Sequence, residues 1–364
     1  MTTQSIGTQV HDNATLPLAD KSWFARLSTW GMVLFALLVI ELVFFSITNS
    51  SFFGGGLGMS KQVVLFLPTG LVALGLGMVV LTGEIDLSVG AIAATTSVVV
   101  GMLLLKGFPI WLSITIALLV GLALGLANGL LVAKLRMNSL LATLAMQFAI
   151  NALANAMAGS HPPAHFATSF QFFGRGRIAG LAFPLIVFLI LGIIIWQLMS
   201  NTSFGRRVCL IGFNRSAGTY SGIPVSRTLI GVFAGSGLMA GLAGVLIASY
   251  YDAGRPSSSS ALLMPALTCV VLGGIDVFGG KGRMSDVIIA VLLLGFLTQG
   301  LLNSGVSSLT ATMLQGVLLV VALIIKSSIE GYGLNGLMRR YAKRLGSTTT
   351  DSPDPETNEQ VKEK

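Results

Sequence analysis

Residues Leu81–Ala91 read LTGEIDLSVGA, and two long apolar runs meet at this short polar stretch. Neither the run before it, Val63–Leu81, nor the run after it, Leu87–Leu105, contains a charged residue. Each run is close to the ~20 apolar residues with which an α-helix crosses a ~30 Å hydrocarbon core. Because Glu84 and Asp86 lie between the two runs, the pattern predicts two membrane-spanning helices separated by a polar break.

The composition of the whole chain agrees with a membrane protein. Of its 364 residues 53% are hydrophobic and only 10% are charged, and the mean hydropathy is +0.83. Soluble proteins carry about 25% charged residues, and disordered chains are polar. The net charge of +8 comes from basic residues spread along the chain. We therefore expect no nucleic-acid partner, since nucleic-acid-binding domains gather their basic residues on one face.

Ten apolar segments are long enough, or nearly so, to cross a membrane, and the sequence predicts an all-α polytopic membrane protein. The segments are Thr29–Ile47, Val63–Leu81, Leu87–Leu105, Ile110–Ala133, Ser139–Met157, Leu181–Met199, Leu229–Tyr251, Ala261–Phe278, Val287–Leu302 and Leu309–Ile325. The eighth and ninth are the weakest, because one ends in a Gly-Gly pair and the other is short.

The basic residues predict how the chain crosses the membrane. With the N-terminus inside and ten crossings, 17 of the 22 basic residues lie on the inner side. If the eighth segment were a re-entrant loop, only 8 would lie inside and 14 outside. The positive-inside rule favours ten crossings with both termini in the cytoplasm. The membrane domain then covers residues 29–326, between polar cytoplasmic tails at 1–28 and 327–364, the second of which is expected to be largely disordered.

The sequence lacks the motifs of common catalytic and cofactor sites. No GxxxxGK[ST] phosphate loop, HExxH zinc motif or GxSxG nucleophile motif occurs. Its two cysteines, Cys209 and Cys269, form no metal-binding pair, and its three histidines make a weak case for a metal site. We expect no enzymatic activity, no cofactor and no metal, so any chemical energy enters from another protein.

Side-chain amides recur at helical spacing in the predicted spans. Gln147, Asn151 and Asn155 follow one another every four residues, so they share one helix face. Gln299 and Asn303 repeat the spacing in the ninth span. Uncharged amides bind hydroxyl groups well, which suits a path for a polyhydroxylated solute. A polar ladder that holds neighbouring helices together explains the same pattern equally well.

Small residues on two predicted spans indicate close helix packing. Gly121, Gly125 and Gly129 form one continuous face, and Gly237 and Gly241 form another. Glycines at this spacing let helix backbones approach closely in membranes. We therefore assign both faces to packing between helices.

Acidic residues in or beside the spans have competing interpretations. Glu41 is expected to reach the outer interface, with a cavity or a basic partner as the alternative. Asp86 or Ser88 is expected to cap the N-terminus of the third span, with a gate or a cation site as the alternative. The stretch Val80–Asp86 is similar in sequence to Val271–Asp276 when the two are aligned with a one-residue gap. This similarity is a hint that the two halves of the chain are related.

A long polar connection between the sixth and seventh spans predicts a docking element. Residues 201–228 carry four arginines together with several glycines, whereas ordinary connections have ~4–6 residues. Apolar residues within it argue against disorder. We expect Arg215–Ser221 to form a short surface helix that docks a partner. The alternative is a basic loop held by anionic membrane lipid, at ~1 kcal/mol per basic residue.

Four stretches resemble signature segments of a known family, the permease subunits of bacterial ATP-binding-cassette sugar importers. The branch concerned imports ribose, xylose, galactose or autoinducer-2. The stretches are LTGEIDLSVGA (Leu81–Ala91), GLANGLLVAKLRMNSLLATLAM (Gly125–Met146), IGFNRSAGTYSGIPV (Ile211–Val225) and VLGGIDVFGGKGR (Val271–Arg283).

The resemblance implies an inner-membrane, multi-pass permease of about ten helices that pairs with a second copy or a paralogue. Two cytoplasmic ATP-binding-cassette subunits dock on its inside loop, and a periplasmic solute-binding protein delivers the solute. The docking motif falls on Gly212, Asn214, Arg215, Ala217, Ser221 and Gly222. The signature turn, a candidate gate, falls on Gly83, Glu84, Asp86, Ser88 and Gly90.

Four positions depart from the family pattern. Glu84 stands where the family signature usually has glycine, and Gly218 replaces an alanine of the docking motif. Asp276 stands where a small hydroxyl residue is usual, and Asp286 where glycine is frequent. The alternative function is an ion-coupled carrier or channel that needs no ATPase. Such a carrier needs buried charge, and only Glu41, Glu84 and Asp86 offer it.

Overall fold

The computed structural model describes residues 29–48, 58–257 and 261–329. The predicted tail at 1–28 lies outside these ranges, as does the predicted tail at 327–364 except for residues 327–329, which are the end of the last described helix. The described chain is almost entirely helical. Its helices are α1 (Thr29–Thr48), α3 (Gly58–Leu81), α4 (Val89–Leu105), α5 (Ile110–Ala133), α6 (Ser139–Ala158), α7 (Thr168–Arg175), α8 (Phe183–Asn201), α9 (Ser203–Phe213), α10 (Arg215–Tyr220), α11 (Val225–Tyr251), α13 (Leu263–Leu272), α14 (Met284–Asn303) and α15 (Ser308–Ile329). A small antiparallel hairpin, β1 (Arg177–Ile178) and β2 (Leu181–Ala182), precedes α8.

Eight of the described helices are long and apolar enough to cross a membrane, so the chain is an all-α, multi-pass membrane protein. Two of the ten predicted spans are shorter helices: α4 has 17 residues and α13 has 10. A ten-residue helix rises only ~15 Å, about half of the hydrocarbon core. The predicted span Ala261–Phe278 is therefore longer than its helix, because the chain turns at Gly273 and Gly274, before the apolar side chains of Ile275, Val277 and Phe278.

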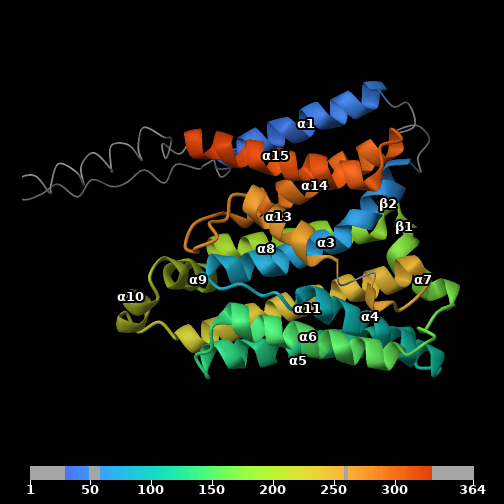
Figure 1. Ribbon diagram of the computed structural model, residues 1–364, viewed down its shortest axis with the longest axis horizontal. Coiled ribbons are helices and arrows are strands. Elements are labelled where there is room, and N and C mark those ends of the chain that lie inside the picture. Colours follow the sequence, from blue (N-terminus) through green and yellow to red (C-terminus); the bar gives the residue numbers. More distant parts are fainter. Residues whose placement is uncertain (1–28, 49–57, 258–260, 330–364) are drawn as a thin grey trace, which may run out of the picture.

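The long helices run roughly along one direction, with different small elements at the two ends (Figure 1). At one end lie α9 and α10, together with the connections from α3 to α4 and from α13 to α14. At the other end lie α7 and the β1–β2 hairpin. We call the first end the docking end. The start of α1 also lies there, since the indole N–H of Trp30 donates to the carbonyl of Leu272, 2.8 Å away.

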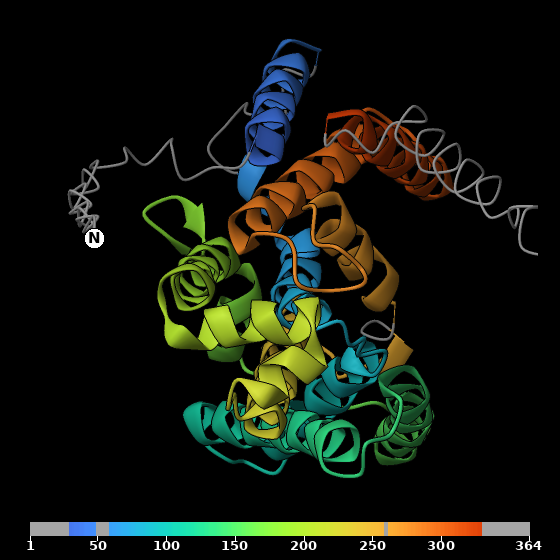
Figure 2. The same cartoon turned by 90° about the vertical axis from the view of Figure 1, so that its left-hand side faces the viewer.

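Helix α3 occupies the centre of the bundle. Its span is 94% buried, and it contacts α11, α13, α14 and α8. Viewed along the bundle, α4, α5, α6 and α11 gather on one side of α3, while α13, α14, α15 and α1 gather on the other (Figure 2). Solvent-facing side chains of a soluble protein would be polar, but here the outer helices expose apolar side chains such as Leu141 and Val320, as lipid contact requires.

The two glycine faces pack against each other, which confirms their predicted role. A Cβ atom placed on Gly125 would lie 2.4 Å from the carbonyl oxygen of Phe233, and one on Gly237 would lie 2.3 Å from the carbonyl oxygen of Gly121. Side chains at these positions would push α5 and α11 apart. The glycines thus hold these two helices in backbone contact over several turns.

Candidate functional site

The two breaks in the bundle, between α3 and α4 and between α13 and α14, share a local structure. Each begins with a glycine in the left-handed region, Gly83 at φ +78° and Gly274 at φ +80°. In each, an aspartate then accepts a hydrogen bond from the backbone N–H two residues further on. Both bonds, to Asp86 and to Asp276, measure 3.0 Å. The echo between these stretches in the sequence is therefore also an echo in structure.

The predicted docking helix is present as α10. The Asn214 side chain caps it by accepting a hydrogen bond of 2.9 Å from the N–H of Ala217. The helix ends at Tyr220, one residue before the predicted end, and Gly222 then turns the chain at φ +73° toward α11. Tyr220 is 92% exposed, so α9 and α10 present an exposed aromatic side chain at the docking end.

The backbones of three distant segments meet beneath α10. A Cβ atom on Gly212 would lie 2.1 Å from the carbonyl oxygen of Leu81 and 2.4 Å from the N atom of Gly280. A Cβ atom on Gly279 would lie 2.4 Å from the N atom of Gly83. The Gly280 N–H donates to the Leu81 carbonyl at 2.9 Å.

We call Gly83, Gly212, Gly279 and Gly280 the glycine junction. It joins the docking motif directly to both breaks, with no room for a side chain between them. Three of the four stretches that carry the family resemblance therefore meet at one place. Because closely packed backbones transmit strain, we expect a displacement of α9 to displace both breaks.

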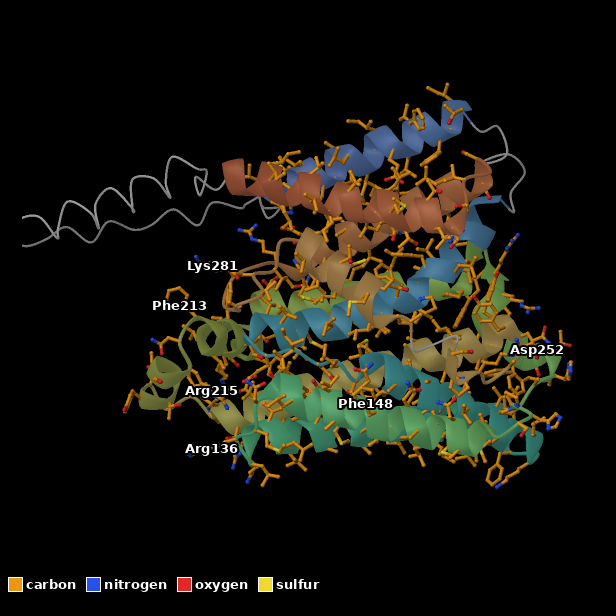
Figure 3. All side chains as sticks on the ribbon, viewed as in Figure 1. Arg136, Phe148, Phe213, Arg215, Asp252 and Lys281 are labelled. Atoms are coloured by element: carbon orange, nitrogen blue, oxygen red, sulfur yellow. The ribbon has the colours of Figure 1, made fainter. Side chains whose placement is uncertain are left out.

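An ion pair adds a second link between α10 and the first break. Arg215, the first residue of α10 (Figure 3), places its Nη1 atom 2.8 Å from Oε1 of Glu84. The Arg215 side chain is 46% exposed and that of Glu84 is 14% exposed. Such a pair contributes ~0–1 kcal/mol to stability, so its main effect is on the placement of α10. Glu84, where the family usually has glycine, thus has a partner on the docking helix.

The predicted cap on α4 is wrong. Asp86 accepts hydrogen bonds from both the backbone N–H (3.0 Å) and the hydroxyl (2.7 Å) of Ser88, and no side chain caps the start of α4. The Ser88 oxygen in turn accepts from Nδ2 of Asn128 on α5 at 2.6 Å. Ser236 on α11 donates to the other oxygen of Asp86 at 3.3 Å. Gly90, the last residue of the signature, is buried in the first turn of α4.

Asp86, Ser88, Asn128 and Ser236 form a fully buried polar cluster that ties the first break to α5 and α11. Sequence analysis missed Asn128 and Ser236, which lie 40 residues or more from Ser88 or Asp86 along the chain. Burying a carboxyl group is costly unless its oxygens are hydrogen-bonded, and here both oxygens accept such bonds. Among the described residues, the Asn128 carbonyl oxygen has no partner.

Helix α6 holds the same break from the other side. The Thr143 hydroxyl lies 3.2 Å from the Ile85 carbonyl and accepts from the Leu87 N–H at 3.1 Å, while Ser139 accepts from the Ile85 N–H at 3.3 Å. Sequence analysis did not single out Ser139 or Thr143. Their spacing of four, directly at the start of a span, was the available signal.

The amide residues do not form one surface in a single chain. On α6, Gln147 and Asn151 are half-buried and Asn155 is exposed. Asn155 donates to the backbone carbonyl of Asn151 at 2.8 Å. Gln299 is buried in α14, and Asn303 is exposed at the end of that helix. Because α6 packs on α4 and α5 while α14 packs on α3 and α1, the two sets lie on opposite sides of the bundle (Figures 1 and 2).

Glu41 does not reach outward as expected. It lies on the buried face of α1 between Leu38 and Phe45, and both of its carboxylate oxygens are buried. Among the described residues neither oxygen has a hydrogen-bond partner. Helix α1 packs on α14, and with both carboxylate oxygens buried the Glu41 side chain does not extend to the membrane surface.

The chain resembles known proteins over most of its length. The family described as "Branched-chain amino acid transport system / permease component" matches residues 58–323. The autoinducer 2 import system permease protein LsrD of Escherichia coli (strain SMS-3-5 / SECEC) is 38% identical over 304 residues, which cover 82% of this chain and 92% of that protein. Proteins of the same name from Escherichia coli K12 and Shigella flexneri give the same identity and coverage. No solved structure matches the chain.

The match includes both breaks, the docking motif and the glycine junction, so it covers the whole of the site described above. Members of this family are membrane subunits without catalytic activity of their own, and ATP is hydrolysed in separate subunits. The chain therefore belongs to the permease-component family and is the membrane-spanning subunit of an ATP-binding-cassette importer.

Proposed function

We propose that the chain imports a sugar-like solute as one half of a permease dimer driven by two cytoplasmic ATPase subunits. A solute-binding protein delivers the solute on the opposite side of the membrane. The observation that carries the proposal is the glycine junction, which places the end of α9, directly before α10, in backbone contact with both breaks. Movement of α10 by an ATPase then changes the position of the breaks, and the two permease copies alternate between outward-open and inward-open states.

The solute class rests on the relatives and on the amide face of α6. The relatives' printed names concern autoinducer 2 import. On α6, the uncharged side-chain amides of Gln147 and Asn151 are partly exposed on the outside of a single chain. This arrangement suits a small, uncharged, polyhydroxylated solute that passes between two copies. We assign the path to α6, whereas buried Gln299 is better suited to packing.

The orientation rests on the charges at the two ends of the bundle. The docking end carries more of the described basic residues than the other end. At the docking end lie Lys134, Arg136, Arg206, Arg207, Arg215, Arg227, Lys281 and Arg283, and at the other end lie Lys106, Arg175, Arg177 and Arg255. The positive-inside rule then puts the docking end in the cytoplasm of a bacterial inner membrane. We retain ten membrane segments, with α4 and α13 as the two that are shorter than a full span.

Two of the three acidic residues that an ion-coupled carrier could use have structural partners. Glu84 is paired with Arg215, and Asp86 is hydrogen-bonded by Ser88 and Ser236. The third, Glu41, is buried without a hydrogen-bond partner among the described residues, and one isolated carboxyl group does not make a relay across the membrane.

Affinity purification of the tagged chain in mild detergent tests the assignment of the docking element. We expect an ATP-binding subunit at about equal stoichiometry with the wild-type chain. The Asn214→Ala/Ser221→Ala double variant removes the cap of α10 and a hydroxyl at its end, so it should remain in the membrane but recover less of that subunit. Full recovery with the double variant would contradict the assignment of docking to α10.

A further inference from the structure

A pocket of about 700 Å³ opens at the docking end beside α10. The end of α5, helix α10 and the start of α11 form its walls. Four basic side chains line it, namely Lys134, Arg136, Arg215 and Arg227, and no acidic side chain does. Figure 3 shows Arg136 and Arg215 at the same end of the bundle. We call this the basic pocket.

The charge of the basic pocket is largely unbalanced within the described part of the chain. Glu84 pairs with Arg215, but no described carboxylate forms an ion pair with Lys134, Arg136 or Arg227. The start of α11 adds further positive potential, since no described side chain caps this 27-residue helix. Like charges gathered in a pocket at a membrane surface favour the binding of an anion.

Beside the basic groups the pocket is lined by the hydroxyl side chains of Ser216, Thr219 and Ser226 and by apolar side chains, and the apolar side chains bear on which class of anion it binds. Ala133, Ile223, Val225 and Ile230 line it beside the basic groups. Directly next to it, Leu135 is 67% exposed and Met137 is 43% exposed, so basic and exposed apolar residues alternate along 134–137. An inorganic anion or an acidic peptide gains nothing from these apolar side chains. A phospholipid does, because its acyl chains contact them while its headgroup meets the charges.

We propose that the basic pocket binds the headgroup of an anionic phospholipid from the cytoplasmic leaflet. Its phosphate is held by Arg136 and Arg227, and its acyl chains lie along Leu135 and Met137. Arg215 belongs to the pocket and also to the ion pair with Glu84. A bound lipid therefore lies against the docking helix and reduces the repulsion among the basic groups around it.

Native mass spectrometry of the purified full-length chain, incubated with phosphatidylglycerol or phosphatidylcholine, tests the proposal. We expect retention of phosphatidylglycerol by the wild type, and retention reduced about tenfold or more in the Arg136→Gln/Arg227→Gln variant, which loses two charge-assisted contacts. Arg206→Gln/Arg207→Gln is the matched control, because it removes the same charge from the exposed face of α9 outside the pocket. The control should retain phosphatidylglycerol as the wild type does.

Three results would overturn the proposal. Equal loss of phosphatidylglycerol retention in the pocket variant and in the control would show that the lipid is attracted by the net charge of the protein alone. If millimolar inorganic phosphate displaces the lipid and binds with the same affinity as the lipid, the pocket is a phosphate site. Unchanged lipid retention in the pocket variant, with loss of the co-purified ATPase subunit, would assign the pocket to an acidic segment of that protein. The assignment to the cytoplasmic leaflet rests on the orientation in the proposed function, but the lipid readout needs no ATPase, so failure of one is distinguishable from failure of the other.

Discussion

Gly212 and Gly218 lie six positions apart in the docking motif but have different surroundings. A Cβ atom on Gly212 would lie 2.1 Å from the Leu81 carbonyl, whereas the nearest atom to one on Gly218 is 3.8 Å away. Only the first glycine is required by close packing. This explains why a family position that usually holds alanine can hold Gly218 here, and it supplies a matched pair of substitutions.

Gly212→Ala should impair transport, while Gly218→Ala should not. The first substitution forces α9 away from the end of α3 and costs ~1–3 kcal/mol, as overpacking does. The measurement is ATP-driven uptake, corrected for the amount of assembled complex in the membrane. If Gly212→Ala transports as well as Gly218→Ala, the backbones at the glycine junction are not in obligatory contact.

The ion pair between Glu84 and Arg215 should affect transport by positioning α10 rather than by stabilising the fold. We expect Arg215→Glu to lower uptake a few-fold, because a pair of this exposure contributes ~0–1 kcal/mol and like charges then repel. The charge-swapped double variant Glu84→Arg/Arg215→Glu should recover most of the loss. Failure of the swap to recover any activity would show that Arg215 acts on another group, such as a partner protein.

At the scale of elements, hydropathy predicts the long helices well because lipid demands ~20 apolar residues per span. The helix α5 has the predicted bounds, Ile110–Ala133, and the short docking helix begins at the predicted Arg215. The contacts of the first break could not be predicted in this way. Asn128 and Ser236 come from helices distant in sequence, and hydropathy carries no information on which helices are neighbours.

The buried cluster around Asp86 should stabilise the fold of the first break. Asp86→Ala removes the acceptor of the Ser88 N–H and of the Ser88 and Ser236 hydroxyls, at ~1–3 kcal/mol for each buried group left unsatisfied. We expect a lower Tm in detergent, measured by size-exclusion chromatography after heating. Asp86→Asn keeps an acceptor oxygen and should lose less. Equal Tm values for wild type and Asp86→Ala would remove the structural role of the cluster.

The amide face of α6 belongs to the same scale. Asn151→Leu should lower uptake without lowering assembly, because it removes a half-buried amide that suits a polar solute. Leu153→Met is the control, since Leu153 is exposed elsewhere on α6 and keeps its apolar character. Unchanged uptake kinetics in Asn151→Leu would assign this face to packing between helices.

At the scale of the whole molecule, the two ends of the bundle differ in their small elements and in their number of basic residues. Labelling of single cysteines from one side of the membrane tests this division, after replacement of the native Cys209 and Cys269. We expect Ser216→Cys to react only from the cytoplasm and His165→Cys only from the opposite side. The reverse pattern would invert the orientation.

The central claim is that an ATPase moves this permease through α10. The most direct measurement is solute uptake by proteoliposomes that contain the chain with its co-purified ATPase subunit and its binding protein. We predict uptake with ATP supplied on the side of α10 and none with an ion gradient alone. Uptake by the chain without the ATPase, driven by an ion gradient, would contradict the claim.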